Sequence, residues 1–554
     1  ARLKDAGRDW LLVDNAAAVK GMSFRLSVCG FCCLFFIYPI AIASGGSVFV
    51  KTSEGTLRGF DSIVLKKHVV TFLGVPFAEP PVKDLRFREP VPIRPWSGVR
   101  DATKPSPTCI QPLPEEWQYE NPMTRVWLNT TQMSEDCLYL NIWTNSINAS
   151  RQNTAEEAEQ IWERDRAVAT STDNWPENIR HQNQQRRHRR SVAFQNFNGR
   201  PVMVWIHGGN LVTGSANLEI YNGAYLASEM GVIVVSIQYR LGPLGFLCLG
   251  SPGIPGNMGL LDQIAALEWV RRNIAYFGGN PSQITIFGQG SGAVSAALHI
   301  LSPISSNLFQ QAILQSGSAL SGWAIESVES ATEKAKIFAR LNGCQVSEAS
   351  QTYLKETEAC LRSVEASSLV VNQWQLNLFP SPATSTRAHR ISRIYHRRYS
   401  SKVLSTTGSF FEITFKVVVK EPFLPSWPYQ IIDSQRENMN HRVLLGVNKD
   451  ESVFEMINGL RMYYLKQGRI PHLPEEFRYA ENIFDPLDIL AFYIIDENFL
   501  HPLLLQATAF EYEIPSRAFY QKEWTAEQVQ QSLAEAAGDY CVKCPVVRFA
   551  DLYS

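Results

Sequence analysis

The sequence predicts an α/β protein with a central, mostly parallel sheet flanked by helices. Two observations carry this prediction. From residue 200 onward, short apolar runs rich in β-branched residues alternate with helical patterns, which is the order typical of βαβ units. The apolar run 284–287 also leads directly into a glycine-dense turn, which a small-residue helix at 293–300 then leaves. The functional loops of such a sheet lie at the carboxyl ends of its strands.

The expected elements follow from hydrophobic periodicity. Antiparallel strands are predicted by the alternating runs 49–51, 56–59 and 69–78 and by the run 134–143. Buried parallel strands are predicted at 202–206, 232–237, 284–287, 312–316 and 443–447. A helix is predicted over 260–275, where apolar residues recur three and four apart, and the residues 278–281 should stop it.

Composition places the chain among globular proteins. It has 554 residues, of which 45% are hydrophobic and 19% charged, enough apolar material for a large core. A net charge of −1 argues against a nucleic-acid partner. Neither a His/Cys ligand spacing nor a phosphate loop occurs in the sequence, so we expect no metal and no cofactor.

The N-terminal region predicts export. Residues 22–43 combine a start methionine, Arg25, an apolar run and the small residues 41–43, as a signal peptide does. Residues 1–21 then correspond to an untranslated leader. A membrane anchor is the alternative, although the run is short for a span, and membrane attachment stays open. We therefore expect a secreted or extracellular protein whose mature domain covers 44–554, with the C-terminal part of that domain incomplete.

Two further features fit an exported chain. Asn129 and Asn148 begin glycosylation sequons. Seven of the ten cysteines follow residue 43, and an odd number leaves at least one without a partner in this chain.

Two stretches lack a folding pattern. Residues 151–199 are polar and charged, which predicts a disordered surface loop. Within them, 187–190 would suit a basic-site protease, and an uncut solvated loop is equally compatible. Residues 375–419 have no assignable period, so they are expected to be a disordered loop insertion or sequence foreign to the mature protein.

Ordered motifs across the chain resemble the cholinesterases, within the type-B carboxylesterase family, and this resemblance implies the α/β-hydrolase fold. It covers about 47–147, 200–374 and 421–451, with a weaker tail to 553. The motifs that carry it are 135–141 (EDCLYLN), 205–209 (WIHGG), 239–242 (YRLG), 255–263 (PGNMGLLDQ), the strand, glycine-dense turn and helix start at 284–295, and 445–451 (LGVNKDE).

The resemblance also exposes a missing nucleophile. Ester cleavage needs a nucleophile, a base, a carboxylate that orients the base, and amides that hold the oxyanion. The family's nucleophile elbow reads Gly-x-Ser-x-Gly, but here Gly290 stands at the apex. Loss of such a serine costs on the order of a million-fold in kcat. Ser291 stands one residue late, and the resemblance gives its N–H to the oxyanion hole, with those of Gly209 and Asn210.

The rest of the triad is incomplete. The acid corresponds to Glu451, for which a solvated loop glutamate is the alternative interpretation. The family's histidine lies in a His-Gly motif after the acid. Only His472 and His501 follow Glu451, and neither precedes glycine, so the base is not found. Asn210 also carries a Cβ where glycine is usual, which would hinder close backbone approach to an oxyanion.

The resemblance implies a cationic ligand site and a disulfide pattern. Trp127, Tyr221 and Trp323 match aromatic residues that line the family's gorge, and Trp127 matches the one that stacks on choline. Taken singly, each aromatic is more often a core residue than a ligand contact, but the spacing of Trp127 before Cys137 reverses this for Trp127. Val453 and Gln289 replace residues that would favour a cation. The implied disulfides are Cys109–Cys137 and Cys344–Cys360. Cys248 is expected as a buried thiol, and Cys541 or Cys544 as half of a third pair.

Two functions remain in competition. The first is a secreted, cholinesterase-like protein that is catalytically impaired and binds a choline-ester-like small molecule or a cell-surface protein partner, since inactive relatives serve as adhesion ectodomains. The second is an active serine carboxylic ester hydrolase, acetylcholinesterase-like, whose sequence is imperfectly reported, because glycine and serine codons can differ by one base. A homodimer is compatible with either.

Overall fold

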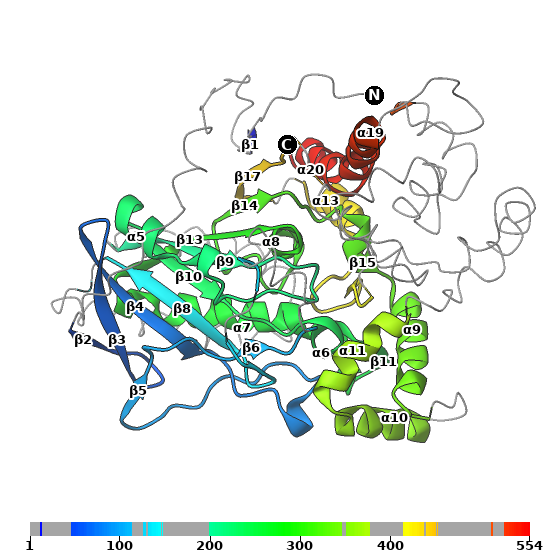
Figure 1. Ribbon diagram of the computed structural model, residues 1–554, viewed down its shortest axis with the longest axis horizontal. Coiled ribbons are helices and arrows are strands. Elements are labelled where there is room, and N and C mark those ends of the chain that lie inside the picture. Colours follow the sequence, from blue (N-terminus) through cyan, green and yellow to red (C-terminus); the bar gives the residue numbers. More distant parts are fainter. Residues whose placement is uncertain are drawn as a thin grey trace, which may run out of the picture.

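The computed structural model describes residues 11–13, 46–112, 126–128, 131–145, 147, 199–345, 351–376, 414–436, 439–449, 451, 511–512 and 526–554. Its main sheet has 11 strands in the order β1-β17-β14-β13-β9-β10-β8-β4-β3-β2, with β5 paired to β3 (Figure 1). Helices α5, α7 and α8 pack against this sheet. The fold class predicted from the sequence is confirmed.

The sheet has an antiparallel and a parallel part. The antiparallel part consists of β2 (Ser47–Lys51), β3 (Thr56–Val64), β4 (Lys67–Pro76) and β8 (Tyr139–Thr144). The parallel part consists of β10 (Ile233–Ile237), β9 (Arg200–Ile206), β13 (Gly279–Gln289), β14 (Gln311–Gln315) and β17 (Arg442–Gly446). Two short strands extend its edges, β1 (Leu11–Val13) and β5 (Val99–Asp101). Three two-stranded pairs lie apart from it: β6 (Thr108–Cys109) with β7 (Met133–Ser134), β11 (Cys248–Ser251) with β12 (Ile254–Pro255), and β15 (Ile325–Glu326) with β16 (Val417–Val418).

The helices connect and cover these strands. Their bounds are α5 (Ala224–Met230), α6 (Gly242–Phe246), α7 (Met258–Asn273), α8 (Ser291–Leu301), α9 (Val328–Leu341), α10 (Gln351–Ser363), α11 (Ala366–Leu376), α13 (Pro428–Gln435), α19 (Ala526–Gly538) and α20 (Cys544–Tyr553). A π-helical turn, Asp539–Lys543, joins the last two. Every residue of α8 and of β10 is buried, as expected where a parallel sheet is covered by a helix. Among the described residues, no helix is both long and apolar enough to cross a bilayer.

Several sequence predictions need correction at their boundaries. The helix predicted over 260–275 is α7, which begins two residues earlier and continues into a 3-10 turn, Ile274–Phe277. Gly278, with a φ of 84°, ends it, whereas Gly279 already begins β13. Residues 414–419, at the end of the predicted insertion 375–419, differ from the expectation of disorder because they include β16, which is buried.

Other predictions concern residues that the structure largely does not describe. The signal peptide 22–43, the rest of the insertions 151–199 and 375–419, the sequons at Asn129 and Asn148, and the basic run 187–190 all lie outside the described residues. Within the predicted leader 1–21, only β1 is described, and it pairs antiparallel with β17.

A buried polar network fixes α8 against its neighbours. His299 on α8 contacts Gln263 Oε1 through Nε2 at 2.8 Å and Ser305 Oγ through Nδ1 at 2.9 Å. Desolvation lowers the pKa of His299 to about 3. Desolvation also lowers the pKa of His207, which directly follows β9, to about 4. The hydrogen bond between His207 Nδ1 and the Gly208 carbonyl acts in the opposite direction and raises this pKa. The folded protein therefore holds both imidazoles neutral.

We expect these two histidines to make the fold acid-sensitive. In the unfolded chain each titrates near 6.5, so below that pH the unfolded state binds protons that the folded state excludes. Stability is therefore full above pH 6.5 and falls as the pH approaches 4, by about 2 kcal/mol per histidine at pH 5. Urea unfolding at pH 7.5 and pH 5 measures this loss. His299→Gln should roughly halve the histidine-dependent part, and an unchanged pH dependence in that variant would contradict the assignment.

Candidate functional site

The elbow has the geometry that its glycines predict. Gly290 joins β13 to α8 with a φ of 56° and a ψ of −121°. Its N–H donates to the Gln315 carbonyl at 2.9 Å, and its own carbonyl accepts from the Val294 N–H at 3.0 Å. Both flanking glycines are sterically required: a Cβ on Gly288 would lie 2.5 Å from the Gly292 backbone, and one on Gly292 would lie 2.1 Å from the Ile206 carbonyl oxygen.

Gly290, at the apex, differs from Gly288 and Gly292 because a side chain at this position would not clash with other atoms. A Cβ on Gly290 would meet no atom within 4 Å. A side chain there is therefore disfavoured only by the backbone conformation, at a cost of about 1–3 kcal/mol for an L-residue. The site has space for a nucleophile that the sequence does not supply.

This contrast predicts that two alanine variants lose stability to different extents. Gly290→Ala should lower the free energy of unfolding by about 1–3 kcal/mol. Gly292→Ala should cost more than 3 kcal/mol or prevent folding, because backbone atoms of β9 must move. Thermal unfolding of the two purified variants measures the difference. Equal destabilisation would show that the elbow is less tightly packed than the structure indicates.

Ser291 is buried and already hydrogen-bonded. Its Oγ accepts the N–H of Leu211 at 3.3 Å, which ties the start of α8 to the loop after β9. The hydroxyl is thus engaged within the protein rather than offered to a ligand. This agrees with the inference that Ser291 does not substitute for the missing nucleophile.

The loop after β9 has the backbone shape that its resemblance requires. Gly209 has a φ of 111°, and a Cβ there would lie 2.2 Å from the Thr213 carbonyl oxygen. Asn210 follows with a φ of 56°, a left-handed conformation that asparagine tolerates better than most residues. Its side chain is exposed, so its Cβ does not prevent the turn. No acceptor for the N–H groups of Gly209, Asn210 or Ser291 is found among the described residues. Their role in an oxyanion hole stays a prediction.

Ser316, a residue that the sequence analysis missed, holds Glu451 beside the elbow. The hydroxyl of Ser316 donates to Glu451 Oε1 at 2.5 Å, and the Asn448 N–H donates to the same oxygen at 2.7 Å. Ser316 directly follows β14 and has a φ of 56°, and its N–H donates to the Gly446 carbonyl. The sequence signal that could have indicated Ser316 is the Ser316-Gly317 pair at the carboxyl end of the predicted strand 312–316. Two hydrogen bonds therefore hold Glu451 Oε1 beside Ser316, and the role of Glu451 as the triad acid stays a prediction. His472 and His501 lie outside the described residues, so the absence of a base stays a prediction.

Two of the three predicted ligand-site aromatics come together. Trp127 is 47% exposed, and its ring centroid lies 6.2 Å from that of Tyr221 in an edge-to-face arrangement. Tyr221 contacts Trp205 at 4.9 Å, and Trp205 contacts Phe287 on β13 at the same distance. An aromatic row thus extends from an exposed ring to the strand that carries the elbow. The sequence analysis missed the buried Trp205 and the partly buried Phe287 because aromatic residues at strand positions resemble ordinary core.

Trp323 is placed differently. It lies on a 3-10 helix, Gly322–Ala324, and its Nε1 donates to the Cys541 carbonyl at 3.0 Å. Among the described residues it has no ring contact with Trp127 or Tyr221. Gln289 is exposed beside the apex.

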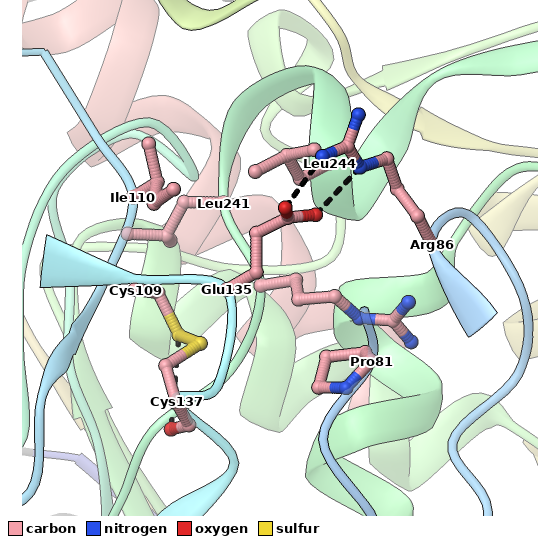
Figure 2. Close-up of a pocket in the computed structure, with 9 residues that line it drawn as sticks. Pro81, Arg86, Cys109, Ile110, Glu135, Cys137, Leu241 and Leu244 are labelled. Carbon is pink, nitrogen blue, oxygen red and sulfur yellow. Dashed lines mark hydrogen bonds and ion pairs between the residues drawn. A yellow bond between two sulfur atoms is a disulfide. The ribbon is translucent and has the colours of Figure 1, made fainter. Parts of the chain in front are cut away.

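The predicted disulfides Cys109–Cys137 and Cys344–Cys360 are both present. Figure 2 shows the first beside a bidentate ion pair, in which the Arg86 guanidinium donates to both Glu135 oxygens at 2.5 and 2.6 Å. Arg86 also donates to the carbonyls of Arg362 and Val364, so the pair anchors the base of the loop that carries Trp127. Cys248 is a buried thiol, as predicted.

Comparison with known proteins agrees with this geometry. Residues 46–554 match the Carboxylesterase family. The chain is 32% identical to an acetylcholinesterase of Bungarus fasciatus over 93% of its own length and 69% of that protein. It is 30% identical to a cholinesterase of Mus musculus over 91% of its length and 67% of that protein. A third relative, acetylcholinesterase 4 of Caenorhabditis briggsae, is 38% identical over 62% of this chain and 48% of that protein.

Proposed function

Because the chain belongs to the carboxylesterase family and has its α/β-hydrolase fold, we propose that it is an exported, cholinesterase-like protein that binds a choline-like cation without efficient ester hydrolysis. Export rests on the predicted signal peptide at 22–43. A cell-surface protein partner, the other ligand class expected from the resemblance, belongs to the same proposal.

The single observation that carries the proposal is Gly290 at the apex of the elbow. A glycine has no atom that could attack an ester carbonyl. The nearest alternative, Ser291, uses its hydroxyl oxygen to accept the Leu211 N–H and is fully buried. The fold of a serine esterase is therefore retained without its nucleophile.

The aromatic pair supports the binding part. A quaternary ammonium is attracted to the face of an aromatic ring, and indole is the strongest of the natural rings in this respect. Trp127 is half exposed and stands against Tyr221, while the disulfide Cys109–Cys137 closes its loop. A ligand could reach this ring from solvent without any part of the elbow reacting.

The test is to incubate the full-length protein with acetylthiocholine. The proposal expects saturable binding of the ester, measured by calorimetry, without release of thiocholine above the uncatalysed rate. Release at the rate of a serine cholinesterase would overturn it.

We expect Trp127→Ala to weaken binding of tetramethylammonium about tenfold, since a cation–π contact at a partly desolvated site contributes about 1–2 kcal/mol. Trp127→Phe should lose less because it keeps an aromatic face. Trp427→Ala, an exposed tryptophan before α13, is the matched control and should bind like the wild type. Calorimetric titration measures all three. Equal affinities would remove Trp127 from the site.

A second candidate is active ester hydrolysis by a chain with serine at 290. The observation that favours it is the open space at the apex, into which a serine side chain fits without a clash. Resequencing the transcript at codon 290 decides between the two functions, because a confirmed glycine codon excludes the second.

A further inference from the structure

We propose that the end of the β3–β4 hairpin, together with the end of α5, docks onto the surface of an anionic phospholipid bilayer. This inference is independent of the proposed ligand and of the elbow. Its centre is the two-residue turn formed by Leu65 and Lys66, which follows the last strand pair of the hairpin, Val64 with Lys67. Leu65, Lys66 and Lys67 are all exposed.

The hairpin extends past the neighbouring strands of the sheet. β2 pairs with β3 only as far as Phe60, and β8 pairs with β4 only from Val70 onward. Between these positions, the described residues of β3 and β4 form strand pairs only with each other. Figure 1 shows this end of the hairpin beside α5. Because the turn extends beyond β2 and β8, it can meet a flat surface that those strands do not reach.

Exposed apolar side chains lie at and around the turn. Leu65 and Ile63 are each 55% exposed, and Met230, the last residue of α5, is 67% exposed. Ile63 precedes Leu65 by two residues, which is about 7 Å along a strand. The end of α5 is fixed beside the turn, because the hydroxyl of Ser228 donates to the Val64 carbonyl at 2.9 Å. A bilayer interface would cover all three apolar side chains.

The backbone of the turn does not account for its leucine. Leu65 has a φ of 48° and Lys66 a φ of 66°, so both occupy the left-handed region. A two-residue hairpin turn with both values positive favours Asn-Gly, and a leucine is disfavoured in it. Leu65 is not compensated by burial, because most of its side chain faces solvent. Unfavourable conformations of this kind are typical of functional positions.

The charges around the turn favour an anionic surface. The basic side chains at this end of the molecule are Lys66, Lys67, His68 and Arg200, of which the last donates to the Gly231 carbonyl after α5. Two carboxylates face them: Glu229 lies 3.3 Å from Lys67 Nζ, and Asp61 lies 2.6 Å from His68 Nδ1. Even with a neutral imidazole, the cations outnumber the carboxylates. Each lysine near a membrane surface strengthens binding to acidic lipids.

The test is cosedimentation of the full-length protein with vesicles of phosphatidylcholine and phosphatidylserine, beside vesicles of phosphatidylcholine alone. We expect saturable binding to the mixed vesicles, weakened about tenfold without phosphatidylserine and also weakened by high salt. Leu65→Asn should weaken this binding about tenfold, because the leucine no longer enters the interface. Its thermal stability should be unchanged or higher, since asparagine suits the turn. Weaker binding by this variant therefore cannot come from misfolding.

Two further variants separate charge from general surface effects. Lys66→Glu should weaken binding to the mixed vesicles by about tenfold or more, and should leave binding to phosphatidylcholine alone unchanged. Val371→Asn is the matched control, because Val371 is 60% exposed on α11, away from the hairpin. This control should bind both kinds of vesicle like the wild type.

Three results would overturn the proposal. The first is that the wild-type protein does not bind the mixed vesicles, and the second is that Leu65→Asn binds them as tightly as the wild type. The third is binding to heparin, in place of vesicles, that Lys66→Glu weakens and Leu65→Asn does not. That result would identify a sulfated glycan, recognised by charge alone, as the partner of this surface.

Discussion

Gly290→Ser is expected to leave acetylthiocholine turnover within about tenfold of the wild-type protein, both on the order of a million-fold below a serine cholinesterase. The new hydroxyl would stand in open space at the start of α8. Its reactivity depends on a histidine base, and in a well-studied serine protease loss of the base costs about as much as loss of the nucleophile. Within residues 452–554 neither histidine precedes glycine, so this expectation applies to a chain of these 554 residues. Thiocholine release measures the result.

Gly290→Ala is the matched control, because it adds the same Cβ at the same positive φ without the hydroxyl. The serine and alanine variants should therefore be alike in both stability and turnover. A gain of a thousandfold or more in the serine variant alone would contradict the expectation. It would show that His472 or His501 serves as the base, and the corresponding double variants would identify which.

Asp262→Ala is expected to destabilise the fold by about 3–5 kcal/mol. The Arg240 guanidinium donates to both Asp262 oxygens at 2.7 Å, and the Arg240 N–H donates to Oδ2 at 3.1 Å. The side chains are 4% and 0% exposed, so removing the carboxylate leaves a buried cation without a counter-charge. Urea unfolding of the purified variant measures the loss.

An exposed ion pair provides the control. Arg58 and Asp101 are 41% and 45% exposed and 3.1 Å apart, so Asp101→Ala should cost less than about 1 kcal/mol. Similar losses in the two variants would mean that Arg240 finds another partner or water when Asp262 is removed. The control also reveals any general effect of losing one negative charge.

The sequence predicted most of the fold because its strands are strongly patterned. β10 and residues 284–287 of β13 are rich in β-branched residues, and the glycines at 288 and 292 mark a turn with close backbone contacts. The short strands β15 and β16 were not predictable. β16 spans two residues and is held by Asn257, whose side-chain amide bonds the backbone N–H and carbonyl of Val418 at 2.8 Å. No local pattern marks such a partnership across 161 positions.

The candidate site was predictable where a motif fixes the backbone and not where side chains meet at a distance. Gly290 and the disulfides followed from motifs and resemblance. Ser316 was missed because its hydrogen bond to Glu451 joins the ends of two strands far apart in the chain. Trp323 was expected among the gorge aromatics, yet its indole N–H is used by the backbone of the C-terminal segment. Tertiary contacts of this kind carry no periodic signal.

The order of the strands also has a consequence for biosynthesis. β17 lies beside β14 in the sheet, and Glu451 follows it, so the surroundings of Gly290 are completed by residues made long after the elbow itself. At about 5–20 residues per second, the ribosome needs on the order of ten seconds to bridge that interval. During this time the apolar edge of β14 lacks its neighbour. Chaperone binding to the nascent chain should therefore be strongest between the emergence of β14 and that of β17.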